Sequence, residues 1–220
     1  MKGDLHMAKD TNKSAKKKII LVLTVIAITL LVMYALTLVI PMLTEKLIES
    51  DEEGTANFKF YEPNYEEDIF TDEKYMSLIK DGFLSYDNGS NSISQIFDDN
   101  TDQFGDEVEL LAELVYSIQR GDDETYNSFF SQEYLNKNGK KENFTMQKIY
   151  DATITYYSTE TVSDKNGNYT RYIYKLKYRI YHNNGTFRQD IDEDAKTQYI
   201  VLTDREGKLL IDAISTTKYK

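Results

Sequence analysis

Hydrophobic and polar residues follow three different patterns along the 220-residue chain. Residues 19–43, IILVLTVIAITLLVMYALTLVIPML, form an uninterrupted stretch without a charge. Residues 106–120 repeat apolar positions at the three- and four-residue spacing of an amphipathic helix. From residue 152 to the end the apolar period becomes two, which is typical of strands. The chain therefore predicts an apolar N-terminal segment, a helical middle and a β-rich C-terminal part.

The apolar stretch at 19–43 predicts a transmembrane helix. Its residues, at a rise of about 1.5 Å each, extend roughly 37 Å, enough to cross a hydrocarbon core of about 30 Å. A cleaved signal peptide is the alternative, but its apolar region is usually about 7–15 residues long and is followed by small residues. Here the sequence TEKLIESDEE follows the stretch. An uncleaved signal anchor is therefore favoured.

Charge is distributed unevenly around this segment. Residues 1–18 hold six Lys and two Asp, and the whole chain carries −11, which leaves −15 on residues 44–220. Positive flanks stay on the cytoplasmic side of a span. We therefore expect a single-pass protein of the cell membrane, with residues 1–18 as a basic cytoplasmic tail and residues 44–220 extracytoplasmic. The acidic balance argues against a nucleic-acid partner, and the absence of cysteine excludes disulfides and thiol chemistry.

Residues 44–70 are acidic and lack a strong helical period, which predicts a stalk before a domain at 71–220. Within the domain, Thr71 is expected to start a short helix that ends near Gly82, because acidic and then apolar residues follow it at helical spacing. The next stretch, 85–92 or SYDNGSNS, is rich in turn-forming residues and predicts a loop.

Two further helices are predicted before the strands begin. Asp106 starts the clearest one and Gly121 ends it. A second helix is expected to begin at Asp122 or Asp123. Its apolar stripe is aromatic and consists of Tyr126, Phe129, Phe130 and Tyr134. Both helices would bury one face.

Strands make up the rest of the domain. They are expected at 152–163, 169–182, 186–203 and 208–215, with turns at Asn166-Gly167, Asn184-Gly185 and Glu206-Gly207. Successive strands joined by tight turns form an antiparallel meander. The predicted fold class is therefore α+β, with an N-terminal transmembrane helix followed by helices packed on a curled four-stranded antiparallel sheet.

Basic residues occupy one face of the strand at 169–182. A two-residue turn at Asn184-Gly185 would place them opposite acidic residues of the next strand. The three expected pairs are Lys175 with Asp194, Lys177 with Asp192, and Arg179 with Asp190. This register explains the basic stripe as a ladder of cross-strand ion pairs. A site for an anionic ligand is the alternative.

Catalytic motifs are missing from the chain. The nucleophile elbow G-x-S-x-G, the zinc motif H-E-x-x-H and the Gly-rich phosphate loops do not occur. The two histidines, His6 and His182, lie on either side of the predicted membrane span and cannot share a site. His182 is expected to be an exposed residue beside a hairpin turn. We therefore expect a non-enzymatic protein.

One acidic tract, 98–109 or DDNTDQFGDEVE, aligns with a calcium-binding loop. The ligand positions would be filled by Asp98, Asn100, Asp102, the carbonyl of Phe104, Asp106 and Glu109. Gln103 replaces the glycine that such a loop needs at its sixth position. An acidic helix N-terminus, which complements the helix dipole, explains the same residues without a metal. Calcium is the one cofactor that the sequence suggests.

Aromatic residues are abundant, with 18 Tyr and ten Phe. Strand propensity and core filling account for them. The alternative is a pocket between the helices and the sheet. Its lining would be Tyr172, Tyr174, Tyr178 and Phe129 or Phe130.

The order of these elements resembles a known fold. The helix LLAELVYSI, the segment RGDDETYNSFFSQEYL and the four strands, over residues of about 105–217, resemble the cystatin-like fold of nuclear transport factor-like domains. With the basic tail and single span, the layout is similar to the single-pass assembly-factor subunits of type IV secretion and conjugation machines. The resemblance implies a non-enzymatic hub that binds other envelope-complex subunits or a second copy of itself. A ligand-binding or enzymatic pocket and an envelope sensor or regulator are the alternative functions.

Overall fold

The computed structural model describes residues 58–90, 93–97, 99–164, 167–205 and 207–218. The chain divides into two units, Met1–Asn57 and Phe58–Lys220, and the fold below is that of the second unit. The predicted tail and membrane span at 1–43 lie outside the described residues. Within the described ranges, no helix is both long and apolar enough to cross a membrane.

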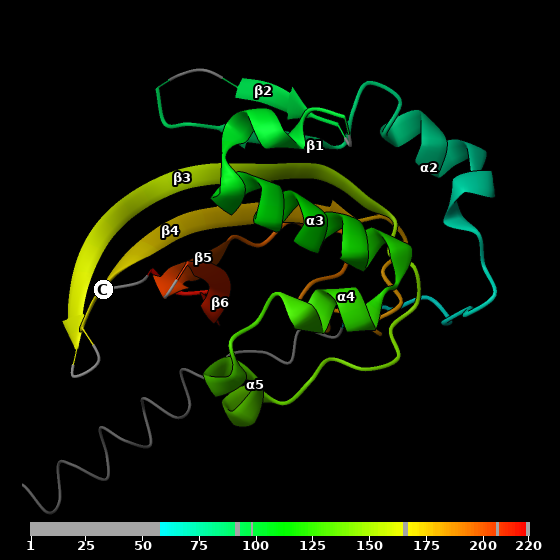
Figure 1. The fold of residues 1–220 in the computed structure, drawn as a ribbon. Coiled ribbons are helices and arrows are strands. Elements are labelled where there is room, and N and C mark those ends of the chain that lie inside the picture. Colours follow the sequence, from blue (N-terminus) through cyan, green and yellow to red (C-terminus); the bar gives the residue numbers. More distant parts are fainter. Residues whose placement is uncertain (1–57, 91–92, 98, 165–166, 206, 219–220) are drawn as a thin grey trace, which may run out of the picture. The chain divides into compact units, whose positions relative to one another are not determined.

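Short helices precede the main strands (Figure 1). They are the 3-10 helices η1 (Ile69–Thr71) and η2 (Thr101–Phe104) and the α-helices α2 (Glu73–Leu78), α3 (Asp106–Arg120), α4 (Asp123–Ser128) and α5 (Gln132–Asn138). Side-chain caps explain three of the helix starts. Asp72, Asp122 and Ser131 each accept a hydrogen bond from a backbone amide in the first turn of the helix that follows.

The sheet has six strands in the order β2-β1-β3-β4-β5-β6. Their bounds are β1 Leu84–Asp87, β2 Ile93–Ile96, β3 Ile149–Asp164, β4 Gly167–Ile180, β5 Gln198–Arg205 and β6 Lys208–Ser215. Strands β1 and β3 pair in parallel, and all other neighbours are antiparallel. The architecture is α+β, but the predicted four-stranded antiparallel sheet is wrong, because the described residues form a six-stranded mixed sheet.

The first error lies in the predicted loop at 85–92. Its first three residues, 85–87, belong to β1, which forms a hairpin with β2; in this hairpin Leu84 pairs with Ile96 and both side chains are buried. On its other side β1 pairs in parallel with β3, Leu84 beside Ala152. Strands of only four residues, LSYD and ISQI, depend on a partner that is distant in sequence, and local periodicity cannot reveal that partner.

The second error lies in the predicted strand at 186–203, since β5 begins only at Gln198. The preceding residues form a loop that the buried side chain of Asn183 organises. Its amide nitrogen donates to the carbonyls of Arg188 at 3.1 Å and Ile191 at 2.8 Å, and its oxygen accepts from the amide of Gly185 at 3.0 Å. These bonds replace the ladder that a strand would need.

The expected ladder of ion pairs is therefore wrong. Across β3, Lys177 lies opposite Thr153, and Arg179 lies opposite Tyr150. Lys175 lies between Thr155 on β3 and Tyr199 on β5. No acidic residue of the 190–194 stretch belongs to a strand, so the basic stripe has no cross-strand acidic partner on that side.

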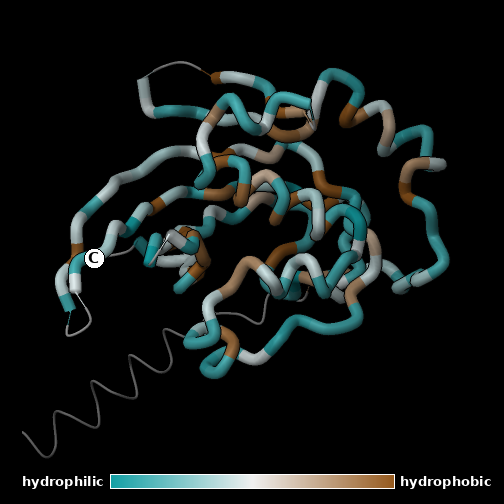
Figure 2. Tube along the Cα trace, in the orientation of Figure 1, coloured by the Kyte–Doolittle hydropathy of each residue, from teal (hydrophilic) through white to brown (hydrophobic). Residues whose placement is uncertain are grey.

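Helix α3 lies across one face of the sheet and carries most of the helical contribution to the core (Figure 1). Its apolar residues, brown in Figure 2, concentrate where the sheet runs beneath it. The predicted bounds, Asp106 and Gly121, are confirmed. Gly121 adopts φ 67°, and a Cβ there would lie 2.8 Å from the backbone nitrogen of Met146. Glycine is required at this helix end because both the conformation and the space exclude a side chain.

The predicted second helix is divided into α4 and α5. The amide of Ser131 donates to the carbonyl of Ile211 at 2.9 Å, and the amide of Ile211 donates to the carbonyl of Phe129 at 2.8 Å. These two bonds join the segment between the helices to β6, so α4 ends at Ser128 and a separate helix begins at Gln132. Helix α5 therefore packs next to β6 and borders the space described next.

Candidate functional site

A cavity of about 210 Å³ lies between α3, α4, α5 and the helix-covered face of the sheet. Apolar side chains from α3, the sheet and the connecting segments form about half of its wall. They include Leu114, Ile118, Phe130, Leu176, Phe187 and Ile200. An apolar cavity of about 150 Å³ is known to hold benzene. The space therefore accommodates one ring and a few further heavy atoms.

Tyr126 of α4 packs at the centre of the aromatic wall. Its ring centroid lies 4.9 Å from that of Phe130, 5.8 Å from that of Phe144 and 5.4 Å from that of Phe187. Tilted and edge-to-face contacts of this kind stabilise a fixed arrangement of rings. Burial raises the pKa of the Tyr126 hydroxyl, so this group stays protonated and neutral.

Arg188 brings a charge to this apolar wall. Its side chain is only 5% exposed, and Nε and Nη2 donate to the two carboxylate oxygens of Asp190 at 2.8 and 2.7 Å. The Tyr178 hydroxyl interacts with the guanidinium through hydrogen bonding as well as through charge, and the Tyr178 ring centroid lies 5.3 Å from the guanidinium carbon. Nη1, which is also buried, makes no hydrogen bond within the described part of the chain. Burial opposes the charge, but Asp190 outweighs it and raises the pKa of Arg188.

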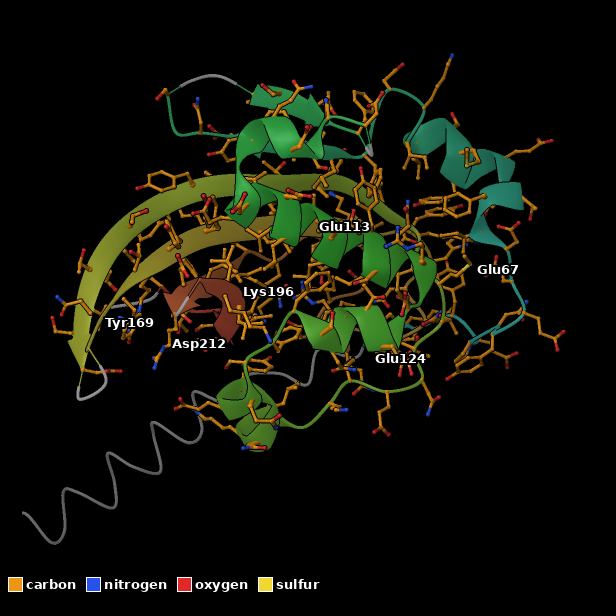
Figure 3. The ribbon with its side chains drawn as sticks, viewed as in Figure 1. Glu67, Glu113, Glu124, Tyr169, Lys196 and Asp212 are labelled. Carbon is orange, nitrogen blue, oxygen red and sulfur yellow. The ribbon has the colours of Figure 1, made fainter. Side chains whose placement is uncertain are left out.

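The carboxylate of Asp190 pairs with a second cation besides Arg188. Its side chain is 40% exposed, and it also pairs with Lys196 at 3.4 Å. Lys196 is labelled in Figure 3. One carboxylate therefore serves two cations, one buried and one at the surface.

A second cation, Lys141, lines the same cavity. Its Nζ lies 5.3 Å from the centroid of the Phe187 ring. Asn127 fixes its backbone, donating to the Lys141 carbonyl at 2.7 Å and accepting from the Lys141 amide at 2.9 Å. Burial lowers the pKa of Lys141, Asp190 counteracts this effect, and Arg188 adds to it. The cavity thus combines an apolar wall with two neighbouring cations.

The predicted aromatic pocket is formed only in part. Tyr178 and Phe130 line the cavity. Tyr174 packs against Tyr156 with centroids 5.7 Å apart, and it does not line the cavity. Tyr172 lies two residues farther along β4 and does not reach the cavity either. Phe129 is held through its carbonyl by β6. The structure therefore brings two of the five candidates to one site.

The calcium-loop tract is described except for Asp98. Asn100 is engaged by the chain itself, because its oxygen accepts from the amide of Phe97 at 2.8 Å and its nitrogen donates to the carbonyl of Gln95 at 3.2 Å. Asp106 and Glu109 lie in the first turn of α3. Among the described residues, no group of three or more His, Asp or Glu is placed to hold a metal ion. With Asp98 outside this set, the calcium site stays a prediction.

An apolar groove of about 750 Å³ lies between η1, the end of α2, the β1–β2 hairpin and α3. Phe70 and Phe97 border it and are 41% and 47% exposed. Phe83 and Tyr116 form an edge-to-face pair in its wall, with centroids 5.5 Å apart. Two cations, Lys80 and Arg120, and one acidic residue, Asp99, also border this apolar groove.

A separate charged centre fixes the N-terminal arm, residues 58–72, to the sheet. Nζ of Lys148 lies 2.7 Å from Glu67 Oε1 and 2.7 Å from Asp72 Oδ2. Glu67 is labelled in Figure 3. Burial disfavours the Lys148 charge, but the two carboxylates outweigh it and raise the pKa of Lys148. Because Asp72 also caps α2 through Oδ1, this centre has a structural role.

His182 is half-buried, and the prediction that it is exposed is wrong. Its ring stacks between Tyr61 and Tyr181, with centroid separations of 4.1 and 3.8 Å. Its backbone adopts φ 52°, and its amide donates to Glu193 at 3.2 Å. Through these contacts, His182 packs Tyr61 of the N-terminal arm against the loop that follows β4.

The sequence did not reveal Arg188 or Lys141. A weak signal existed for Arg188, because Asp190 follows it at a spacing of two residues within a stretch that is predicted as a strand. A cation in such a stretch, with an acid two residues later, is compatible with a local ion pair. Nothing in the sequence places Lys141 beside Phe187, since 45 residues separate them.

Comparisons with known proteins give no relative. No family model matches the chain, and no curated protein or solved structure is significantly similar to it. The resemblance to the cystatin-like fold and to the secretion assembly factors stays a prediction. The features of the chain that bear on its function are the cavity, the groove and the charge pattern.

Proposed function

We propose that this chain is a non-enzymatic, membrane-anchored protein whose extracytoplasmic domain binds other subunits of an envelope-spanning complex. The observation that carries the proposal is the apolar groove with its two exposed rings, Phe70 and Phe97. The apolar stretch at 19–43 and the six lysines before it support the anchor and its orientation. The resemblance in layout favours a channel of the conjugation or type IV secretion class.

The groove has the properties of a protein-binding surface. Contiguous exposed apolar patches on soluble domains commonly mark interaction sites, and aromatic side chains contribute strongly to such interfaces. Phe70 and Phe97 would lose their exposed area when a partner fills the groove. Other exposed apolar residues, Met76 and Leu78 of α2 and Ile93 of β2, do not line the groove.

The partner expected here presents an apolar ridge flanked by acidic residues. The ridge would fill a groove whose wall is aromatic, and the acidic flank would meet Lys80 and Arg120. Arg120 already pairs with Glu113 at 3.4 Å, but both side chains are 42% exposed. An exposed pair of this kind exchanges partners at little cost.

The test is recovery of partners from membranes. The full-length tagged chain, extracted in mild detergent, is expected to bring down other envelope subunits in stoichiometric amounts. The double variant Phe70→Ser and Phe97→Ser should lose them, because it removes both exposed rings from the groove. Tyr156→Ser is the matched control, since Tyr156 is 37% exposed on β3 and does not line the groove.

Two results would contradict the proposal. One is a wild-type chain that is recovered alone under mild extraction. The other is equal recovery of partners by the groove variant and by Tyr156→Ser. Circular dichroism of both variants establishes that the comparison is made between folded proteins.

A further inference from the structure

We infer that the cavity beneath α5 binds a small monocarboxylic acid whose body is a single ring. This site is separate from the groove that carries the proposed function, so either can fail without the other. Four properties of the cavity carry the inference: an unpartnered buried donor, an excess of positive charge, an apolar wall and a size that fits one ring.

The unpartnered donor is Nη1 of Arg188. Buried polar atoms almost always have a hydrogen-bond partner, and exceptions call for an explanation. The guanidinium is fixed by its bidentate pair with Asp190, so it cannot rotate to satisfy Nη1 without losing that pair. A partner for Nη1 therefore has to enter the cavity, either as water or as part of a ligand. A carboxylate oxygen is the acceptor that a guanidinium binds best.

The charges point to the same ligand class. Arg188 and Lys141 both line the cavity. Among the described residues, Asp190 is the carboxylate that pairs with Arg188, and it is shared with Lys196. The lowered pKa of Lys141 reflects this burial and the nearby guanidinium. One additional negative charge would balance the pair of cations. An anion of charge −1 is therefore favoured over a neutral ligand.

The apolar residues of the cavity wall indicate which chemical group carries the negative charge of the ligand. Leu114, Ile118, Phe130 and Phe187 offer apolar and aromatic surface that an inorganic anion would leave uncovered. About 210 Å³ exceeds the volume that holds benzene by room for a carboxylate and one linking carbon. Phenylacetate has these properties and serves as the probe.

Binding is measured by calorimetric titration of the full-length chain in lipid nanodiscs. Phenylacetate is expected to bind with a stoichiometry of one. Phenylacetamide, which has the same shape without the charge, should bind roughly tenfold to hundredfold more weakly, as expected for the loss of a charged hydrogen bond. Inorganic phosphate should not compete. Equal affinity for acid and amide, or competition by phosphate, would overturn the inference.

Substitutions of the two cavity cations test whether phenylacetate binds in this cavity. Arg188→Met should weaken phenylacetate binding tenfold or more, and Lys141→Met should weaken it several-fold. Lys137→Met is the matched control, because it removes one positive charge from exposed surface of α5 outside the cavity, and it should change the affinity less than twofold. Lys141→Met removes only a half-buried charge, so it decides the question even if Arg188→Met fails to fold. Unchanged binding by Lys141→Met, or no binding by the wild-type chain, would refute the site.

Discussion

Two buried cations, Lys148 and Arg188, differ in how completely their donors are used. Lys148 is 9% exposed and contacts two carboxylates, each at 2.7 Å. Arg188 is 5% exposed and contacts one carboxylate through two of its nitrogens, while the third makes no hydrogen bond among the described residues. Burial is nearly the same in the two cases. The two side chains differ in whether a buried nitrogen is left without a hydrogen-bond acceptor.

This difference separates a structural centre from a binding site. At Lys148 the acids belong to the N-terminal arm, so the ion pairs hold that arm and the cap of α2 against β3. At Arg188 the acid lies two residues away on the same loop, so the pair joins no distant segments. Arg188 also contacts Tyr178 of β4, but its ion pair joins no distant segments and one buried donor is left over, which an external ligand would explain.

Replacing Lys148 by Met should have the largest effect on stability. It leaves two carboxylates close together with no cation, and removing one partner of a buried pair costs about 3–5 kcal/mol. Asp72 and Glu67 are 24% and 39% exposed, and water reduces this cost to about 2–3 kcal/mol. Urea unfolding of the full-length chain measures the loss. A smaller loss of unfolding free energy for Lys148→Met than for Arg188→Met would show that Lys148 is not the more important residue for stability.

The Lys148 centre should also respond to pH at both ends of the scale. The hydrogen bond from Lys148, followed by that from the Tyr75 amide, lowers the pKa of Asp72 from 3.8. This stabilisation is complete above pH 3.8 and is lost as the pH falls through the lowered pKa. The pKa of Lys148 is raised from 10.5, so its contribution is lost as the pH rises through that higher value.

The stability difference between wild type and Lys148→Met is therefore expected to be constant between these limits. It should narrow below pH 3.8 and above pH 10.5. Urea titrations at a series of pH values measure it. A difference that stays unchanged on strong acidification would show that Asp72 does not depend on Lys148.

Arg188→Met should cost less than Lys148→Met, about 1 kcal/mol or below. Removing one partner of an ion pair is costly when the other charge is left buried and unpaired, and that condition does not hold at Asp190. Asp190 then retains Lys196 and water as partners, because it is 40% exposed. Urea unfolding compares the two variants side by side. A loss as large as that of Lys148→Met would mean that Arg188 is mainly structural.

Of the three substitutions, Glu113→Gln should lower the free energy of unfolding least. Glu113, labelled in Figure 3, pairs with Arg120 at 3.4 Å, and both side chains are well exposed. Exposed pairs contribute about 0–1 kcal/mol, and here we expect below about 0.5 kcal/mol. The same urea experiment measures it. A larger loss would indicate that the surface near the groove contributes to folding more than its exposure suggests.

The sequence predicted those elements whose signals are local. Helix α3 is recognised because its apolar residues recur at helical spacing and Gly121 ends it with a positive φ. Strands β3 and β4 are recognised from their alternation and aromatic content, and β6 agrees with its predicted bounds of 208–215. In each case the residues that determine the element lie within it.

Other elements depend on distant partners. The hairpin of β1 and β2 is stabilised by β3, and the strand expected at 186–203 is interrupted because the side chain of Asn183 takes up two carbonyls. Arg188 could not be assigned to a site because the cavity around it requires the turn between α4 and α5, which two bonds to Ile211 create. The candidate site is a product of tertiary contacts rather than of a motif.

The N-terminal arm also has a mechanical consequence. The first backbone hydrogen bond of the arm joins the Tyr61 amide to the Asn183 carbonyl at 3.0 Å, and Phe60 packs on Gly185 so closely that a Cβ there would lie 3.1 Å from its ring. Asn183 in turn holds the carbonyl of Arg188. Tension applied to the chain before Phe58 is therefore borne first by the loop that carries Arg188, before any strand of the sheet is loaded.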